Sequence, residues 1–373
     1  MNRLFGIILS ILALLLIVLI VQNVFFAEKT PSKEEEEKDL NIREFISEHL
    51  ADAYDWHITE FGGKSIGVPL PVIVKGKESG WHIFLSSAFH HGTVEHNGFY
   101  IAKEGEYKGK IVEKNAAGEE VRPIDISITK TAFALILNCI LLICIIMYVS
   151  RRYKKYNATN EYKTPKGFIA FMELFIMDIN DSLIKPCIGK DYKKYSPYLL
   201  TVFFFIFLNN ITGLIPLFPG GANVTGNIAI TAVPALCTFL IVNIFGTREY
   251  WREILWPDVP TWLKVPIPIM PALELVSVFT KPFALMIRLF ANILAGHSIV
   301  LGLTCLVFVT VKAGAAVNSS MTIVSVILSV FIGFVEILVA YIQAYVFTML
   351  SAVFIGLSRV EPHHAHAKEK ANK

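Results

Sequence analysis

Long apolar runs, each near or above the length of a membrane crossing, alternate with short polar segments beyond residue 130. A helix of about 20 apolar residues spans the hydrocarbon core of a bilayer. The last two runs exceed that length, so we expect two long, tilted helices there. The pattern predicts an all-α polytopic membrane protein with about five core membrane helices. In chain order the runs are Ala132–Val149, Tyr198–Phe218, Asn227–Phe245, Pro271–Val311 and Met321–Ile355.

The polar residues that flank the apolar runs predict how the chain is threaded. Met1–Phe26 has one arginine and then the apolar run Leu4–Val21, as in a secretory signal or an uncleaved signal anchor. The bulky Phe25 and Phe26 make a poor cleavage site, so cleavage and retention both stay open. In either case the next segment is predicted to lie outside the cytoplasm. The basic cluster Arg151–Lys155, which follows the first core run, and the basic segment Thr247–Lys264 are typical of cytoplasmic loops. Lys312–Ser320 is predicted to be the outer turn between the last two runs.

Residues 28–126 lack a run of membrane-spanning length and predict a small periplasmic α+β lobe. Apolar residues at helical spacing predict a helix over Asn41–His57. None of the five cysteines lies in this region, and its clustered histidines (His82, His90, His91 and His96) lack the Cys/His spacing of a zinc site. The predicted strands, which are separated by glycine-containing turns, are Ser65–Val74, Trp81–Ser86, Gly98–Lys103 and Gly109–Glu113.

These patterns divide the chain into four parts. They are a signal peptide or signal anchor (1–27), the periplasmic region (28–126), a membrane-embedded core (127–358) and a polar cytoplasmic tail with histidines and lysines (359–373). The composition agrees with a membrane protein, because 54% of the residues are hydrophobic and the mean hydropathy is +0.54. A net charge of +3 is too small to indicate nucleic-acid binding.

The apolar run from Pro271 contains polar side chains that are costly inside a membrane, and a charge at such a depth is a functional-site hypothesis by default. At about 100° per residue, Asn292 and Glu274 both fall within about 40° of Arg288 on the helix. His297 falls on the opposite side, about 13 Å along the axis. The spacing predicts one helix with two polar zones on opposite faces. The simpler alternative is a snorkelling arginine beside a packed histidine.

The sequence RLFANILAGH at Arg288–His297, preceded by Glu274 and a Thr-Lys-Pro segment from Thr280, resembles the signature of subunit a of the F-type ATP synthase. That family is the stator that carries ions past a rotating c-ring. Its invariant arginine corresponds to Arg288. Thr280 takes a place where relatives often have serine, and so keeps the hydroxyl. A weaker resemblance extends from about Pro165 to Ser358.

The resemblance implies a role for each polar group. Arg288 faces the c-ring and stabilises its ionised carboxylate, while Glu274 lines the exit half-channel on the cytoplasmic side. His297 and Glu336 match positions that hold an acid and a histidine in either order, in the periplasmic half-channel. The other residues assigned to the proton pathway are Asn292, Asn210 and Gln343, the last of which matches a glutamine that approaches the arginine.

The second core span, Tyr198–Phe218, departs from the family pattern near Asn210. The family commonly has an acid three residues after this asparagine, whereas this chain has Gly213. Asn210 could equally be an ordinary interhelical hydrogen-bonding residue. Both interpretations stay open.

The resemblance also implies the partners and the location. We expect a bacterial inner-membrane protein that binds the c-ring, the peripheral stalk subunit b, the rest of the synthase and lipids. It has no cofactor, no metal and no enzymatic activity of its own. The periodicity of Lys166–Lys185 predicts an interfacial amphipathic helix. Its contact with the stalk is implied by the resemblance alone.

Three alternatives stay open. A sodium-coupled version of the same subunit is one, because ion selectivity in the family depends largely on the c-ring. A secondary transporter is another, although the repeated span pattern expected of that class is not seen. The third is a structural membrane anchor for the outside lobe, which would not need Arg288, His297 and Glu336 in the final helices.

Overall fold

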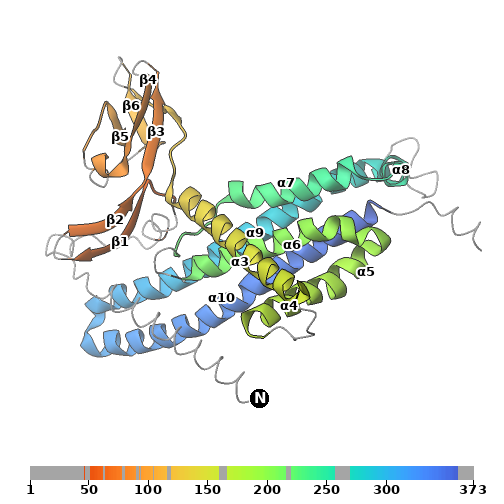
Figure 1. Cartoon of the computed structure of the whole chain (residues 1–373). Helices are drawn as coiled ribbons and strands as arrows, with labels where there is room; N and C mark the ends of the chain where they lie inside the picture. The colour runs from red at the N-terminus through yellow and green to blue at the C-terminus, as the bar shows by residue number, and fades with distance from the viewer. Residues whose placement is uncertain are drawn as a thin grey trace, which may run out of the picture. The chain divides into compact units, whose positions relative to one another are not determined.

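The computed structural model describes residues 46, 51–61, 64–77, 80–89, 92, 94–103, 105–115, 119–158, 166–215, 220–256 and 269–359. These residues form a β-rich lobe followed by long helices (Figure 1). The strands are β1 Asp55–Phe61, β2 Lys64–Pro69, β3 Pro71–Gly76, β4 Gly80–Leu85, β5 Phe99–Ile101, β6 Ile111–Lys114, β7 Glu120–Val121 and β8 Ile124–Asp125. The helices are α3 Lys130–Ala158, α4 Phe168–Asp178, α5 Lys185–Ile188, α6 Tyr192–Leu214, α7 Ile228–Ile244, α8 Arg248–Leu255, α9 Ile269–Thr310 and α10 Ala315–Leu357.

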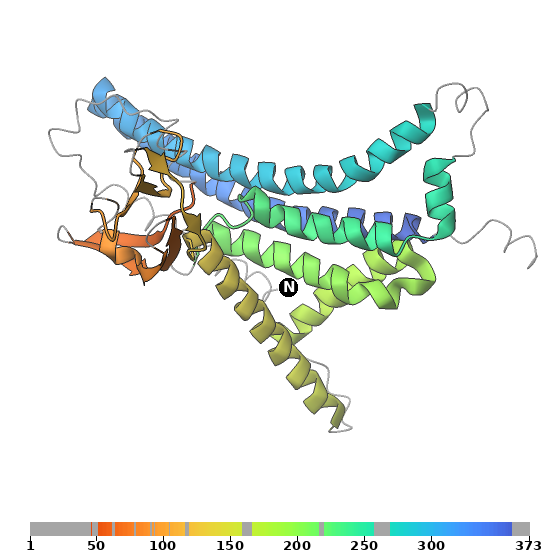
Figure 2. The same ribbon diagram turned by 90° about the horizontal axis from the view of Figure 1, so that it is seen from above.

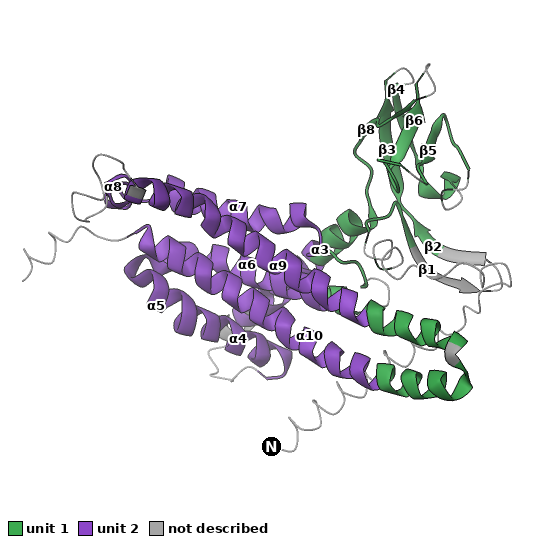
Figure 3. Cartoon of the chain, turned by 180° about the vertical axis from the view of Figure 1, so that it is seen from behind, with its two compact units in different colours: residues 1–138, 212–224, 301–326 green, residues 139–211, 225–300, 327–373 purple. Residues whose placement is uncertain are grey.

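The chain divides into two compact units (Figure 3). Unit 1 contains residues 1–138, 212–224 and 301–326, which include the β-lobe, and unit 2 contains residues 139–211, 225–300 and 327–373. The predicted signal or anchor lies outside the described residues. The predicted domain boundaries and the periplasmic position of the lobe stay predictions.

The lobe has three small antiparallel sheets, β1-β2, β4-β3-β8 and β5-β6-β7. Alternation along β3 turns Val72 and Val74 inward, where they are fully buried. They form a core with Phe89, Phe99 and Ile111. The sequence correctly predicts β4, β5 and β6 to within two residues of their ends.

Two predictions for the lobe are wrong. The predicted strand Ser65–Val74 is two strands, because prolines on both sides of Leu70 remove ladder donors there. The buried Leu70 instead exchanges hydrogen bonds with Ser86. The predicted helix Asn41–His57 cannot extend to its end, because β1 begins at Asp55 and pairs with β2. Most of its earlier residues lie outside the described part of the chain, although Ile46 is helical.

Hydrogen bonds join the lobe to the first turn of α3. Asp52 Oδ1 accepts from the backbone N–H of Thr131 at 3.0 Å and from its hydroxyl at 2.7 Å. The Tyr54 hydroxyl donates to Asp125 Oδ2 at 2.5 Å. Burial, and then this hydrogen bond, raise the pKa of the Tyr54 phenol, so the group stays a neutral donor. The lobe is thereby fixed to the entrance of the first predicted span.

The helices confirm a polytopic membrane protein. Four helical segments are long and apolar enough to cross a membrane, and α7 with α8, bent by 97°, makes up to five. The predicted spans correspond to α3, α6, α7, α9 and α10. The last two have 42 and 43 residues, so each is about 60 Å long, twice the thickness of a hydrocarbon core.

The connections between the helices differ from the sequence prediction in two places. The outer turn predicted over Lys312–Ser320 is shorter, because α10 begins at Ala315 directly after Gly314, whose φ of 102° suits glycine. The predicted cytoplasmic loop Thr247–Lys264 contains α8, whose first turn is capped by the Thr247 side chain. Residues 257–268 of that loop lie outside the described residues.

The predicted amphipathic segment Lys166–Lys185 is helical. It comprises α4, one π-helical turn over residues 179–184, and then α5. Pro186 accounts for the wide turn, because it has no N–H to donate to the carbonyl of residue 182 and its ring crowds that carbonyl. Ile169, Met172 and Ile179 are buried on one face.

The core of unit 2 is centred on α6, whose Leu199, Phe203 and Ile206 are fully buried. The helices α6 and α7 run side by side (Figure 2). Hydroxyl groups link them: Tyr198 lies 2.8 Å from Thr238, which is 3.3 Å from Ser351 of α10. Such interhelical hydrogen bonds replace the hydrophobic driving force that lipid does not provide.

The end of α10 is held by polar contacts with other parts of unit 2. The carbonyl of Ser358 accepts hydrogen bonds from the N–H and the hydroxyl of Thr247 at 2.9 and 3.3 Å. Arg359 donates to Asp191 at 2.8 Å and to the carbonyl of Phe245 at 3.2 Å. The rest of the predicted tail, residues 360–373, lies outside the described residues.

Candidate functional site

Arg288 lies in the middle of α9 on a face that the chain leaves exposed. Asn292, one turn further, is exposed as well. The side of the helix that lies about 60–100° around from Arg288 packs into the core of unit 2, where Leu285 and Leu289 are 2% and 1% exposed. Arg288 forms no ion pair with a described carboxylate. The helix therefore presents a permanent cation outward from the protein.

Small side chains surround Arg288 on this face. Ala284, Ala291 and Ala295 are exposed and lie within about 60° of Arg288 around the helix. Small residues on a membrane helix allow the backbone of another helix to approach closely. We call the surface of Ala284, Arg288, Ala291, Asn292 and Ala295 the arginine face. Alanines are common in apolar helices and so gave no signal in the sequence, although their spacing relative to Arg288 is visible there.

Glu274 lies near the start of α9 and is half-buried. It is 14 residues before Arg288, which corresponds to about 21 Å along the helix. The two side chains lie on the same side but do not meet. Glu274 is therefore a separate polar position between one end of α9 and Arg288.

Glu336 of α10 packs directly on Gly296 of α9. A β-carbon at Gly296 would overlap the Glu336 carboxylate and lie 3.2 and 3.3 Å from its Cδ and Cγ atoms. The absence of a side chain at Gly296 therefore makes room for the acid. Because His297 is the next residue, the structure brings the backbone of the predicted relay histidine beside the predicted relay acid. Both side chains are half-buried.

One face of α10 carries a row of polar residues at nearly helical repeats. Glu336 and Gln343 are seven residues apart, and Gln343 is 5% exposed. Ser329, a further seven residues before Glu336, and Ser325 are also buried. These serines were not predicted as site residues, because serine is common in membrane helices. The sequence feature that could have identified Ser329 is its position seven residues before Glu336, which in turn lies seven residues before Gln343.

Asn210 is buried in α6 and is 2% exposed. Its Oδ1 accepts a hydrogen bond from the Thr225 hydroxyl at 2.8 Å, and its Nδ2 donates to the carbonyl of Ala340 at 3.5 Å. Ala340 lies between Glu336 and Gln343 on α10. Asn210 thus contacts the helix that carries both groups, and Thr225 is its second polar partner.

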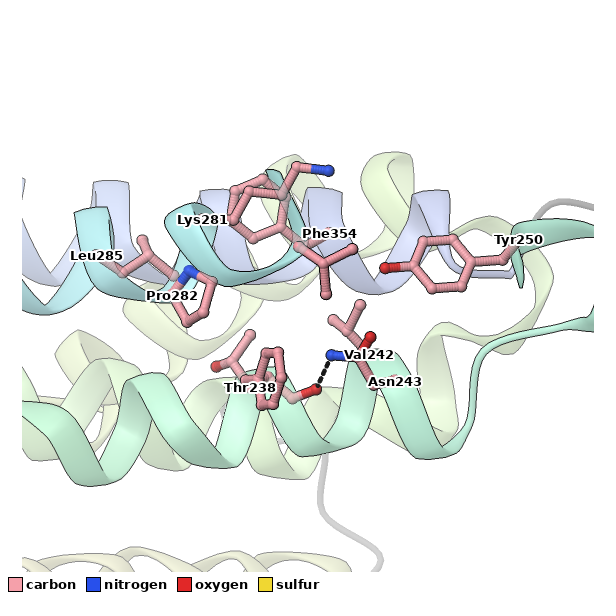
Figure 4. Close-up of a pocket in the computed structure, with 10 residues that line it drawn as sticks. Thr238, Val242, Asn243, Tyr250, Lys281, Pro282, Leu285 and Phe354 are labelled. Atoms are coloured by element: carbon pink, nitrogen blue, oxygen red, sulfur yellow. Dashed lines mark hydrogen bonds between the residues drawn. The ribbon is translucent and has the colours of Figure 1, made fainter. Parts of the chain in front are cut away.

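A small cavity lies between α7, α8, α9 and α10 (Figure 4). Asn243 donates to the carbonyl of Phe239 at 2.7 Å, but its Oδ1 is buried without a partner among the described residues. The cavity has a volume of about 20 Å³, enough for roughly one ordered water. On α9 it is lined by the buried Val278 and Leu285 and by Lys281, which lies about 20° from Arg288 around the helix.

The lobe histidines that the structure describes pack against aromatic rings. His82 lies 5.4 Å from Phe99 and His96 lies 4.9 Å from Phe84, measured between ring centroids. His90 and His91 lie outside the described residues. Within the described part of the chain, no three His, Cys, Asp or Glu side chains are placed to hold a metal ion.

Comparisons with known proteins match the helical part and the lobe separately. A family described as "ATP synthase A chain" matches residues 132–356, and a domain of unknown function, DUF8433, matches residues 45–129. Both matches begin or end close to the junction between the lobe and α3.

Several relatives are similar over most of the helical region. The chain is 41% identical over 247 residues to ATP synthase subunit a of Chlorobium phaeobacteroides, covering 65% of this chain and 68% of the relative. It is 40% identical over 261 residues to ATP synthase subunit a 2 of Chlorobaculum tepidum, covering 67% and 69%. For ATP synthase subunit a of Myxococcus xanthus the identity is 39% over 247 residues, covering 65% and 76%. With a family match over more than half of its length and relatives at this level of identity, the chain belongs to the ATP synthase A chain family.

Proposed function

We propose that the chain passes protons to and from the c-ring of an F-type ATP synthase, with Arg288 as the charge that the ring meets. The family is a non-catalytic, multi-pass membrane subunit of the bacterial inner membrane and works within the ATP synthase complex. The observation that carries the proposal is the arginine face, an exposed permanent cation among alanines in the middle of a long apolar helix.

The arginine face fits a rotor of packed helices that carry carboxylates. The alanines let a neighbouring helix come close, and Arg288 then stabilises an ionised carboxylate that passes it. Because a guanidinium keeps its proton at every physiological pH, it cannot relay protons itself. It also repels a proton that would otherwise cross directly between the two access paths. The rotor must then turn to carry the proton across.

The polar residues on either side of Arg288 provide the two access paths. His297, Glu336 and Gln343 form the periplasmic path, together with Ser329 on the same face of α10. An acid against Gly296 and a histidine at the next position can share a proton and stabilise each other's charge. Asn210 supports α10 between Glu336 and Gln343.

Glu274 forms the cytoplasmic exit. It lies on the side of Arg288 opposite to His297 along α9 and on the same side of the helix as the cation. Asn292 extends the polar surface of the arginine face beside Arg288.

The proposal assigns the remaining partners and the orientation. Stalk subunit b binds the segment from α4 to α5, and the c-ring binds the arginine face. The lobe is periplasmic and residues 359–373 are cytoplasmic, because the basic residues after α3 and in the loop that contains α8 favour the inside. The family match sets aside a secondary transporter and a simple membrane anchor. Neither the site nor the comparisons favour sodium over protons.

The test is ATP-driven proton pumping in inverted membrane vesicles with equal amounts of assembled complex. Arg288→Ala should abolish the quenching of a pH-sensitive dye. Arg288→Lys should fail too, because a lysine is a compact charge that can lose its proton when desolvated. The control is Arg252→Ala, which removes an arginine from the exposed surface of α8 and should pump normally. Normal pumping by the Arg288→Lys complex would overturn the proposed role.

A further inference from the structure

The outer face of the sheet β4-β3-β8 is apolar and uncovered. The register places Ile83 beside Ile73, and Trp81 beside Lys75, which in turn lies beside Ile124. Ile83 is 74% exposed, and the other exposed large apolar side chains on this face are Trp81, Leu85, Ile124 and Ile126. We call these five residues the lobe patch.

The sheet that carries the lobe patch already packs on a hydrophobic core through its other face. The opposite side of the same sheet buries Val72 and Val74 completely against β5 and β6. An antiparallel sheet with one face on the core is expected to carry polar residues on the other face. Here both faces are apolar, so the outer face is adapted to an apolar environment.

The lobe patch is continuous with a membrane-spanning segment in the chain. Only residues 126–129 separate β8 from α3. The N–H groups of Ile126 and Ile128 donate to the carbonyls of Ile73 and Pro71, so pairing with β3 continues to the last residues before the helix. Lys130 N–H then donates to the carbonyl of Ala53. The sheet is therefore tied at close range to the point where the chain enters the membrane.

The polar residue beside the lobe patch suits a lipid headgroup region. The Lys75 ammonium lies 5.6 Å from the centroid of the Trp81 ring. Tryptophan and lysine are the residues that favour a membrane–water boundary, since the indole has an apolar body with a polar edge and the ammonium can reach lipid phosphate. Lys75 is the charged residue among the cross-strand pairs on this outer face, whereas the carboxylate in the register, Asp125, pairs with Val74 of the inner face.

We propose that the lobe patch binds the surface of the lipid bilayer next to α3, so that the lobe lies against the membrane through its outer sheet face. Trp81, Ile83 and Ile124 then insert at the level of the headgroups and upper acyl chains, while Lys75 contacts lipid phosphate. The lobe is an interfacial domain attached to a membrane-spanning helix.

The experiment uses lipids that carry a spin-label quencher near the headgroup. The five native cysteines are replaced by alanine, and Ile83→Cys is labelled with the fluorophore NBD in the assembled complex in nanodiscs. The matched control is Glu106→Cys, an exposed position in the turn between β5 and β6. NBD on Ile83→Cys should lose most of its emission with quencher lipids, whereas NBD on Glu106→Cys should keep it.

A second variant tests whether the lobe patch causes the effect. Trp81→Glu combined with Ile124→Glu in the Ile83→Cys chain should restore the emission, because two carboxylates oppose insertion. Equal emission at positions 83 and 106 with quencher lipids would overturn the proposal. Protection of position 83 from an impermeant maleimide without lipid quenching would overturn it too, in favour of a protein partner or a second copy of the chain.

Discussion

The lobe and the long helices α9 and α10 differ in where their apolar side chains lie. In each region, one described surface does not follow the local pattern. In the lobe, apolar side chains lie inside, and the exception is the exposed lobe patch. On α9 and α10 large apolar side chains such as Ile327 and Phe283 lie outside, as lipid contact requires, and the exception is the exposed arginine face. An apolar surface on the lobe and a charged surface on a lipid-exposed helix therefore each indicate a binding surface, because neither suits the water or the lipid around the rest of its region.

Apart from replacement of Arg288 itself, the largest expected effect comes from filling the space beside it. Ala295→Trp adds a bulky side chain to the arginine face, where the proposed rotor approaches. We expect ATP-driven proton pumping to fall by up to about a hundredfold, since overpacking of this kind costs as much as about 3 kcal/mol. Phe283→Trp, on an exposed lipid-facing side of the same helix, is the matched control and should pump normally. Equal pumping by both variants would show that nothing packs on the arginine face.

The next prediction tests whether His297 and Glu336 act as a pair. His297→Glu places two acids together and Glu336→His two imidazoles, so each single variant should lower pumping by about tenfold or more. The exchanged double variant should recover part of the activity, which is a non-additive result. Proton pumping in vesicles with matched complex content is the measurement. If the double variant pumps no better than the worse single, His297 is a packed histidine and not half of a relay.

A smaller effect is expected from adding one methyl group beside the acid. Gly296→Ala forces the Glu336 carboxylate away from α9, and a displaced relay group costs up to roughly tenfold in proton flux. Gly302→Ala on the same helix is the control, since a β-carbon there has no neighbour within 4 Å. If both variants pump equally well, the position of the Glu336 carboxylate does not matter.

The smallest effect is expected in the lobe. Tyr54→Phe removes the hydrogen bond to Asp125 and should weaken the lobe by about 1–2 kcal/mol. Amide hydrogen exchange of the assembled complex, measured by mass spectrometry, should be faster in β3 and β8. Pumping should stay unchanged, because the lobe lies outside the proposed proton path. A loss of pumping would show that proton transfer depends on the stability of the lobe, and would contradict the separation of the lobe from the proposed proton path.

The sequence predicts the helical region well because membrane helices are long and every backbone group is satisfied within them. The period of 3.6 residues also predicts that Arg288 and Asn292 share a face, and both are exposed. The spacing alone could not reveal that Gly296 is the residue on which Glu336 packs, because that contact depends on the register between two helices.

The lobe was harder to predict for a physical reason. Its strands are short, and the residues at the end of the predicted helix, including Trp56, pair with β2, so tertiary pairing overrides an apparent helical period. The lobe patch could not be predicted either. Alternate apolar residues in β4 predict that one face of the strand is buried, but they do not indicate which of its two faces that is. Ser329 was missed because a single hydroxyl gives no signal without knowledge of its burial.

The polar contacts at the end of α10 can hold that end in place against a sideways force on the helix. In the proposed function, a ring that turns against Arg288 would push sideways on α9, and through the contact of Gly296 with Glu336 also on α10. Thr247 holds the carbonyl of Ser358, and Arg359 is tied to Asp191. These hydrogen bonds would then transmit the force to the segments before α6 and after α7, and would hold the end of α10 in place against the proposed rotor.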